Sequence, residues 1–175
     1  MGTYWTIQSF EKWLEIQEKG YLIGNPDFVD PDFVDAYNWL IKKMNEKNIV
    51  NNQGECPIWL WTERPDLRKK GYLPSKKQGV LLKINIEDSR VLLSDYEAWH
   101  FVLNNWYFNI DMEEDEIDEM YEKGISRSEL EESWELIFDL DYLNNHPDWG
   151  PRLIQGITNK ISLSEITLVK TFIGR

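Results

Sequence analysis

The residues with the clearest chemical potential lie between Trp61 and Arg68, where two guanidinium groups follow an indole within one short segment. Arg64 and Arg68 carry planar forks of N–H donors that suit a phosphate or a carboxylate, and an indole suits a planar base. This combination predicts a site for a nucleotide-like anion. The alternative is that Asp66 pairs with one of the arginines and only holds the loop in place.

A second polar set lies near the start of the chain, where Thr6 and Gln8 alternate with Trp5 and Ile7. Side chains two residues apart share one face of a strand, so Thr6 and Gln8 are expected on one side and Trp5 and Ile7 on the other. Two polar side chains on one strand face can bind a ligand. The alternative is an edge strand with one wet face.

The third set is the segment Asp95–Asn104, in which His100 and Asn104 are four residues apart on one predicted helix. An imidazole can act as a general base, or it can be a hydrogen-bonding core residue. The second role is favoured, because the spacing supplies no partner acid. The other histidine, His146, is far away in the sequence, and neither histidine has a metal-ligand spacing, so no metal site is expected.

The charge pattern restricts the partners of the chain. The formal net charge is −12, and residues 111–141 hold 14 acids against two bases. Residues 64–83 are basic by contrast. An acidic chain argues against broad nucleic-acid binding but leaves room for a local anion site. The run Asp111–Glu122 is either a solvated face or a docking surface for a basic protein partner.

Length and composition predict one cytoplasmic domain that spans residues 1–175. Apolar residues make up 42% of the chain, enough for a core, and the only cysteine, Cys56, excludes an internal disulfide and a cysteine metal cage. No apolar run has the length of a membrane helix, and residues 1–5 lack the features of a signal peptide.

Periodicity predicts the elements that position these residues. Strands are expected at 4–8, 21–23, 58–62, 80–86, 90–94, 153–158 and 167–173, with turns at 51–54, 87–89 and 162–165. Helices are expected at 10–19, after Pro31, after a Ser94–Glu97 capping box, at 111–123, and from a Ser126–Glu129 capping box to Asp141. Because strands and helices do not alternate, the expected fold is α+β, a mostly antiparallel sheet with four to five flanking helices.

Several of these segments together resemble a bacterial family, the domain-of-unknown-function family 3841. The resemblance rests on W-T-I-Q at Trp5–Gln8, on D-L-R at Asp66–Arg68, and on L-L-S-D-x-x-x-W-H-x-V-L-N at Leu92–Asn104. The segments Ser133–Asp139 and Ile154–Gly156 also resemble it. The match covers nearly the whole chain, and the family name implies no activity.

The order of elements is more weakly similar to ADP-ribosyltransferase-like proteins, which cleave nicotinamide from NAD in a cleft of a split sheet. That likeness implies NAD as cofactor, with Thr6 and Gln8 on the nicotinamide ribose or amide and Trp61 stacked on the ring. Arg64 and Arg68 would then bind the pyrophosphate. The catalytic candidates that it implies are Gln155, to position the acceptor, and His100, to assist proton transfer. Where that family has a glutamate on a late strand, this chain has Gln155.

Two functions therefore stand side by side. The first is NAD-dependent transfer of ADP-ribose to a nucleic acid or a protein. The second is a non-catalytic nucleotide- or protein-binding module, of the kind found in bacterial defence or toxin–antitoxin type systems. The amide at position 155 and the acidic segment favour the second.

Overall fold

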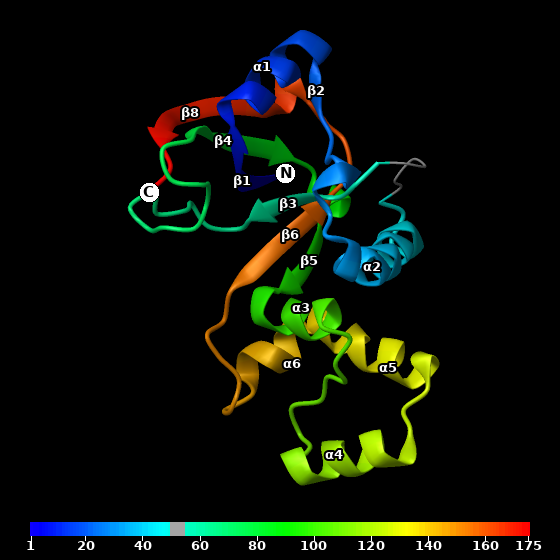
Figure 1. Ribbon diagram of the computed structural model, residues 1–175. Coiled ribbons are helices and arrows are strands. Elements are labelled where there is room, and N and C mark those ends of the chain that lie inside the picture. Colours follow the sequence, from blue (N-terminus) through cyan, green and yellow to red (C-terminus); the bar gives the residue numbers. More distant parts are fainter. Residues whose placement is uncertain (50–54) are drawn as a thin grey trace. The chain divides into compact units, whose positions relative to one another are not determined.

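A computed structural model describes residues 1–49 and 55–175, apart from the side chain of Phe28 (Figure 1). The turn expected at 51–54 lies outside the described residues. The chain forms two compact units. Unit 1 comprises Met1–Phe28, Met44–Leu92 and Gly156–Arg175, and unit 2 comprises Val29–Lys43 and Leu93–Gln155.

The main sheet has six strands in the order β5-β6-β3-β1-β4-β8. β1 pairs antiparallel with β3 and β4, and β4 pairs antiparallel with β8. β2 (Tyr21–Leu22) and β7 (Ile161–Ser162) form a separate antiparallel pair. The α+β prediction is confirmed. The bounds of the six strands are Gly2–Ser9 (β1), Ile58–Trp61 (β3), Gln78–Ile86 (β4), Leu92–Asp95 (β5), Ile154–Thr158 (β6) and Ile166–Ile173 (β8).

Burial alternates along the central strand β1, as the sequence predicts. Tyr4 and Thr6 are buried, whereas Trp5 on the opposite face is half-buried. Thr6 lies directly opposite Leu82 of β4, which is fully buried, so this face packs on the core of unit 1. Because β1 lies between β3 and β4, the alternative of an edge strand with a wet face is wrong.

The two strands around residues 87–89 are predicted correctly, but they do not form a hairpin. A short 3-10 turn, Asp88–Arg90, follows β4, and β5 lies at the opposite edge of the sheet order from β8. Because only the short turn at 87–89 separates the two predicted strands, they were expected to pair with each other. The sheet instead inserts β1, β3 and β6 between them, which are long-range pairings that local spacing does not encode.

Unit 1 also carries helix α1 (Phe10–Lys19), whose two ends follow from local chemistry. The Ser9 hydroxyl accepts a hydrogen bond from the Lys12 amide at 3.1 Å. Gly20 ends the helix with a φ of 81°, a conformation that glycine adopts at little cost. Trp13 and Ile16 are the buried residues of this helix.

The helices of unit 2 pack around aromatic rings. Trp134 is fully buried and meets Trp39 edge-on at 5.4 Å between ring centroids, and Phe138 stacks on Trp39 at 5.7 Å. A 3-10 turn, Pro31–Phe33, capped by Asp30, opens the first helix. The helices are α2 (Val34–Glu46, which belongs to unit 2 as far as Lys43), α3 (Tyr96–Leu103), α4 (Glu114–Lys123), α5 (Arg127–Ser133) and α6 (Leu140–Asn145).

Two predictions about helices in unit 2 are wrong in detail. The cap of α3 is Asp95, which accepts from the Ala98 amide at 2.9 Å, and not Ser94. The long helix expected from residue 126 to Asp141 is broken into α5, a 3-10 segment at Trp134–Phe138, and α6. The second break occurs because the Asp139 side chain accepts from the Tyr142 amide and starts a new helix. The Ser126–Glu129 capping box is confirmed.

The two units differ sharply in charge. Unit 2 contains twenty Asp and Glu residues against five Lys and Arg, whereas unit 1 contains eleven acids against fourteen bases. Unit 2 therefore has a formal charge of −15 and unit 1 of +3, which together give the −12 of the chain. Across residues 1–49 and 55–175, none of the helices combines the length and the apolar character needed to span a bilayer.

Candidate functional site

One face of the main sheet in unit 1 gathers aromatic side chains. Trp5 of β1 lies directly opposite Trp61 of β3, and residues paired in this way project to the same face. Trp59 lies two residues before Trp61 and shares its side. All three indoles are half-buried, so each leaves ring surface accessible. We call this surface, with its neighbouring cations, the Trp5 face.

Cations border the Trp5 face from two directions. The Arg64 guanidinium lies over the Trp5 ring, 5.5 Å from its centroid. Lys83 of β4 is the other strand partner of Trp5 and is half-buried. A guanidinium stacked on an indole keeps its in-plane N–H donors for other partners. The arrangement therefore offers a flat ring surface beside positive charge.

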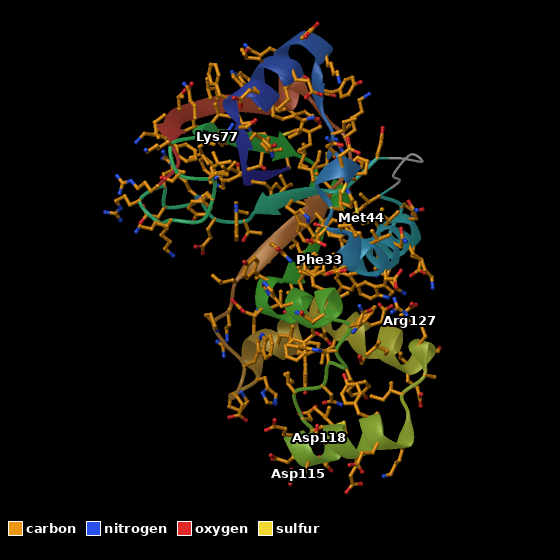
Figure 2. The ribbon with its side chains drawn as sticks, viewed as in Figure 1. Phe33, Met44, Lys77, Asp115, Asp118 and Arg127 are labelled. Carbon is orange, nitrogen blue, oxygen red and sulfur yellow. The ribbon has the colours of Figure 1, made fainter. Side chains whose placement is uncertain are left out.

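The basic loop that follows β3 is held by contacts in its second half. Tyr72 meets Trp61 edge-on, with 6.3 Å between ring centroids. The Lys76 amide donates to the Gly174 carbonyl at 2.9 Å, and the Gly174 amide donates to the Lys77 carbonyl at 2.7 Å. Lys77 is labelled in Figure 2, beside the strands of unit 1. These contacts hold the loop against the C-terminal residues.

Arg68 is engaged with Asp66 and not with the Trp5 face. Its Nε donates to both carboxylate oxygens of Asp66, at 2.9 and 3.1 Å, and its Nη2 donates at 2.8 Å. The bonds from Arg68 lower the pKa of Asp66 to about 2. Arg68 therefore follows the alternative in which Asp66 pairs with an arginine and holds the loop in place. Arg64 remains the arginine beside an indole.

Thr6 and Gln8 lie on the opposite face of the sheet from Trp61. The Gln8 amide donates to the Thr6 hydroxyl at 2.9 Å, and Thr6 is 3% exposed. Because the sheet separates them from the Trp5 face, these two residues and Trp61 do not contact the same ring of a ligand. The structure places Trp61 and Arg64 each next to Trp5, and it brings Thr6 and Gln8 together on the other face.

The two catalytic candidates belong to unit 2, and each has a partner there. The Gln155 amide donates to the Ser94 hydroxyl at 3.3 Å, and both residues are buried. His100 Nδ1 lies 3.0 Å from the Tyr96 carbonyl, which can only accept, so Nδ1 carries the proton. Within residues 1–49 and 55–175, no group of three His, Cys, Asp or Glu side chains is placed to hold a metal ion.

The acidic segment forms α4, as predicted, and it is exposed. Asp115 and Asp118 lie on this helix (Figure 2), and none of its residues is buried. The helix is closed at its start by a capping box between Glu113 and Glu116. The Tyr121 hydroxyl accepts a 2.7 Å hydrogen bond from the Tyr107 amide.

Comparison with known proteins identifies the family. Residues 3–166 match the family described as "Domain of unknown function (DUF3841)". The chain belongs to DUF3841. No curated protein matches it, and no solved structure does. The DUF3841 description states no activity, so the chemistry of this member has to be argued from its own residues.

The DUF3841 segments seen in the sequence have distinct structural uses here. Trp5–Gln8 forms the middle of β1 and supplies both faces of the sheet. Asp66 and Arg68 form a closed ion pair in the basic loop. In Leu92–Asn104, Asp95 caps α3, and its second oxygen accepts from the Trp149 indole N–H at 3.2 Å.

Sequence reasoning missed the residues that complete the Trp5 face. Trp5 and Lys83 were not among the candidates, although Trp5 contacts Arg64 and pairs with Trp61 on one side and with Lys83 on the other. The shared side of Trp59 and Trp61 was visible from their spacing. The register that places β1 beside β3 was not visible, because 48 residues lie between the two strands.

Proposed function

We propose that this DUF3841 member binds a nucleotide on the Trp5 face of unit 1. The observation that carries the proposal is the Arg64 guanidinium 5.5 Å above the Trp5 ring, beside the cross-strand partner Trp61. A base stacked on an indole contributes about 1–3 kcal/mol. A charge-assisted hydrogen bond from a guanidinium to a phosphate adds about 1.5–3 kcal/mol.

The charge of unit 1 supports this choice of ligand. Its fourteen bases outnumber its eleven acids, although the whole chain is strongly acidic. The basic loop that carries Arg64 is held by the contacts of Tyr72 and Gly174, so less loop entropy is lost when a ligand binds.

NAD is the nucleotide that the weaker likeness to ADP-ribosyltransferases suggests, and transfer of ADP-ribose is the activity that it would support. Because Thr6 and Gln8 lie on the opposite face of the sheet from Trp61, fewer ways of binding NAD fit this proposal. Only the adenine or the nicotinamide end of NAD would stack on the Trp5 face, and Thr6 and Gln8 would not hold the same ring.

Equilibrium dialysis with labelled NAD and labelled AMP tests the binding proposal. We expect Arg64→Gln to weaken binding about 10- to 100-fold through the lost phosphate contacts. Trp61→Ala should weaken it about 5- to 150-fold through lost stacking. Lys47→Gln, which removes an exposed charge elsewhere in unit 1, is the matched control. Equal binding by all four proteins would overturn the proposal.

A transfer assay tests the activity separately. The chain is incubated with NAD labelled in the adenylate, together with nucleic-acid and protein acceptors. Label on an acceptor, with nicotinamide released, supports ADP-ribose transfer. If NAD binds but neither labelled acceptor nor nicotinamide is formed, the result would support a non-catalytic nucleotide-binding module and contradict the transfer activity.

A second candidate function follows from the charge of unit 2. Its acids outnumber its bases by twenty to five, and the segment Asp111–Glu122, most of which lies in α4, presents an acidic surface. A basic protein partner fits this surface. Capture of one stoichiometric partner, lost when Asp115 and Asp118 are both changed to Asn, would support it. Capture that is unchanged by these substitutions would contradict it.

A further inference from the structure

A pocket in unit 2, separate from the Trp5 face, opens between α2 and α5. Its volume is about 540 Å³, within the usual range for small-molecule sites. Arg127 extends from the first turn of α5 toward α2 (Figure 2). The lining residues are Asp35, Asn38, Trp39, Lys42, Arg127 and Glu131.

Trp39, one of the lining residues, carries an unsatisfied donor. Trp39 is 3% exposed, and among the described residues no atom accepts a hydrogen bond from its indole N–H. Its ring is fixed between Phe138, stacked at 5.7 Å, and Trp134, edge-on at 5.4 Å. Buried donors in folded proteins nearly always have an acceptor. An orphaned N–H beside a pocket indicates that something else supplies one.

The cations at this pocket are already positioned. The Arg127 guanidinium lies over the Trp134 ring at 4.9 Å, and its Nε donates to Glu131 at 2.7 Å. Its Nη1 donates to the Asn105 side chain at 2.9 Å. These three contacts fix the plane of the guanidinium. They do not involve Nη2, which can donate to a further acceptor.

The distribution of bases in unit 2 points the same way. Only five Lys and Arg residues stand against twenty acids in this unit, yet three of the five lie around the Trp39–Trp134 pair. Lys42 and Arg127 line the pocket, and Lys43 lies 6.0 Å over the Trp39 ring while it pairs with Glu135. Cations gathered in an otherwise acidic unit create a local site for an anion.

We propose that this pocket binds a small molecule through a phosphate or carboxylate group. The anionic group lies between Lys42 and Arg127, and one of its oxygens accepts the hydrogen bond from the Trp39 indole N–H. Asp35 and Asn38 face the remainder of the ligand, which therefore carries a donor as well as the anion.

The indole resonance of Trp39 in the nitrogen-15-labelled full chain provides the test. It is assigned from the signal that is lost in Trp39→Phe. Inorganic phosphate and acetate are titrated separately at constant ionic strength, against chloride, and the two arms distinguish the two anions. We expect a saturable shift of this resonance with at least one of them and none with chloride.

Variants decide whether the pocket causes that shift. Lys42→Gln and Arg127→Gln should each weaken the anion about 10-fold or more, which corresponds to one charge-assisted hydrogen bond. Lys123→Gln, which removes a cation of α4 that pairs with Glu119, should leave the affinity unchanged. No saturable shift with either anion, or the same affinity in both pocket variants as in the wild type, would overturn the proposal. Since Lys42 and Arg127 lie on different helices, loss of fold in one variant leaves the other to decide.

Discussion

Arg64 and Arg68 show how two residues of one type, four apart in the same loop, take different roles. The Arg68 guanidinium donates its hydrogen bonds to the Asp66 carboxylate, whereas the Arg64 guanidinium stacks on the Trp5 ring. The sequence could predict the ion pair of Arg68 with Asp66, because these two residues are only two positions apart. The stacking contact could not be predicted, because Trp5 is far from Arg64 in the chain and reaches it only through the strand pairing of β1 with β3.

Tyr4 gives a prediction about alkaline pH. Burial, reinforced by the hydrogen bond to Asp88, raises its pKa to about 12. The folded pKa lies above the unfolded value near 10, so this stabilising contribution is complete below about pH 10 and is lost as the pH rises to about 12. We therefore expect the free energy of unfolding to fall less between pH 10 and 12 in Tyr4→Phe than in the wild type.

Urea denaturation at pH 9 and pH 11 checks this prediction. At pH 9 the Tyr4→Phe variant should be less stable by about 1 kcal/mol, because it lacks one hydrogen bond. Tyr21→Phe, which alters a half-buried tyrosine of β2 that is not bonded to Asp88, is the control. An alkaline loss of stability that is the same in Tyr4→Phe and in the wild type would contradict the assignment to Tyr4.

The sequence predicted residues well where the cause is local. Ser9, Gly20 and Ser126 act as the helix signals that their types indicate. The sequence was less informative where two neighbouring residues could both cap the same helix. Ser94 and Asp95 both suit the cap of α3, and Asp95 takes it, whereas the Ser94 hydroxyl accepts from Gln155, some 60 residues away.

At the scale of elements, α3 depends on its buried cap. The Asp95 carboxylate is 1% exposed and accepts from the Ala98 amide and from the Trp149 indole. Asp95→Ala removes the cap and leaves a buried N–H without a partner, so we expect a loss of about 2–4 kcal/mol in the free energy of unfolding. Asp139→Ala, which removes only the exposed cap of α6, should cost about 1 kcal/mol.

Chemical denaturation of both variants measures the difference. Asp95→Asn, which keeps an oxygen for the cap, should recover part of the loss. Equal costs for Asp95→Ala and Asp139→Ala would show that the indole contact contributes nothing to stability.

The basic loop depends on close backbone contact with the end of β8. A methyl group at Gly174 would lie 2.3 Å from the Pro74 carbonyl oxygen, which is far inside van der Waals contact. Gly174→Ala should therefore push the loop away and cost about 1–3 kcal/mol. The amides of Lys76 and Gly174 should then exchange with solvent faster, because their hydrogen bonds to the Gly174 and Lys77 carbonyls, respectively, are lost.

Hydrogen exchange followed by NMR tests the loop anchor. Arg175→Ala alters the next, exposed residue and should leave the protection of both amides unchanged. Unchanged protection in Gly174→Ala would mean that the loop does not rely on this contact.

At the scale of the whole molecule, charge separates the two units. Unit 1 is slightly basic and unit 2 strongly acidic. The sequence showed the acidic segment 111–141 and the basic segment 64–83, but it could not show that segments distant in the chain combine into these units. Val29–Lys43 joins Leu93–Gln155 although 49 residues lie between them, and this grouping arises only from tertiary packing. The prediction of one domain over residues 1–175 stays a prediction.

The measurement that tests the account most directly is the response of the Trp5 and Trp61 indole resonances to NAD in the nitrogen-15-labelled full chain. We expect both resonances to shift saturably, and we expect Arg64→Gln to need about 10-fold more NAD or greater for the same shift. Indole resonances of Trp5 and Trp61 that stay in place at every NAD concentration would contradict nucleotide binding on the Trp5 face.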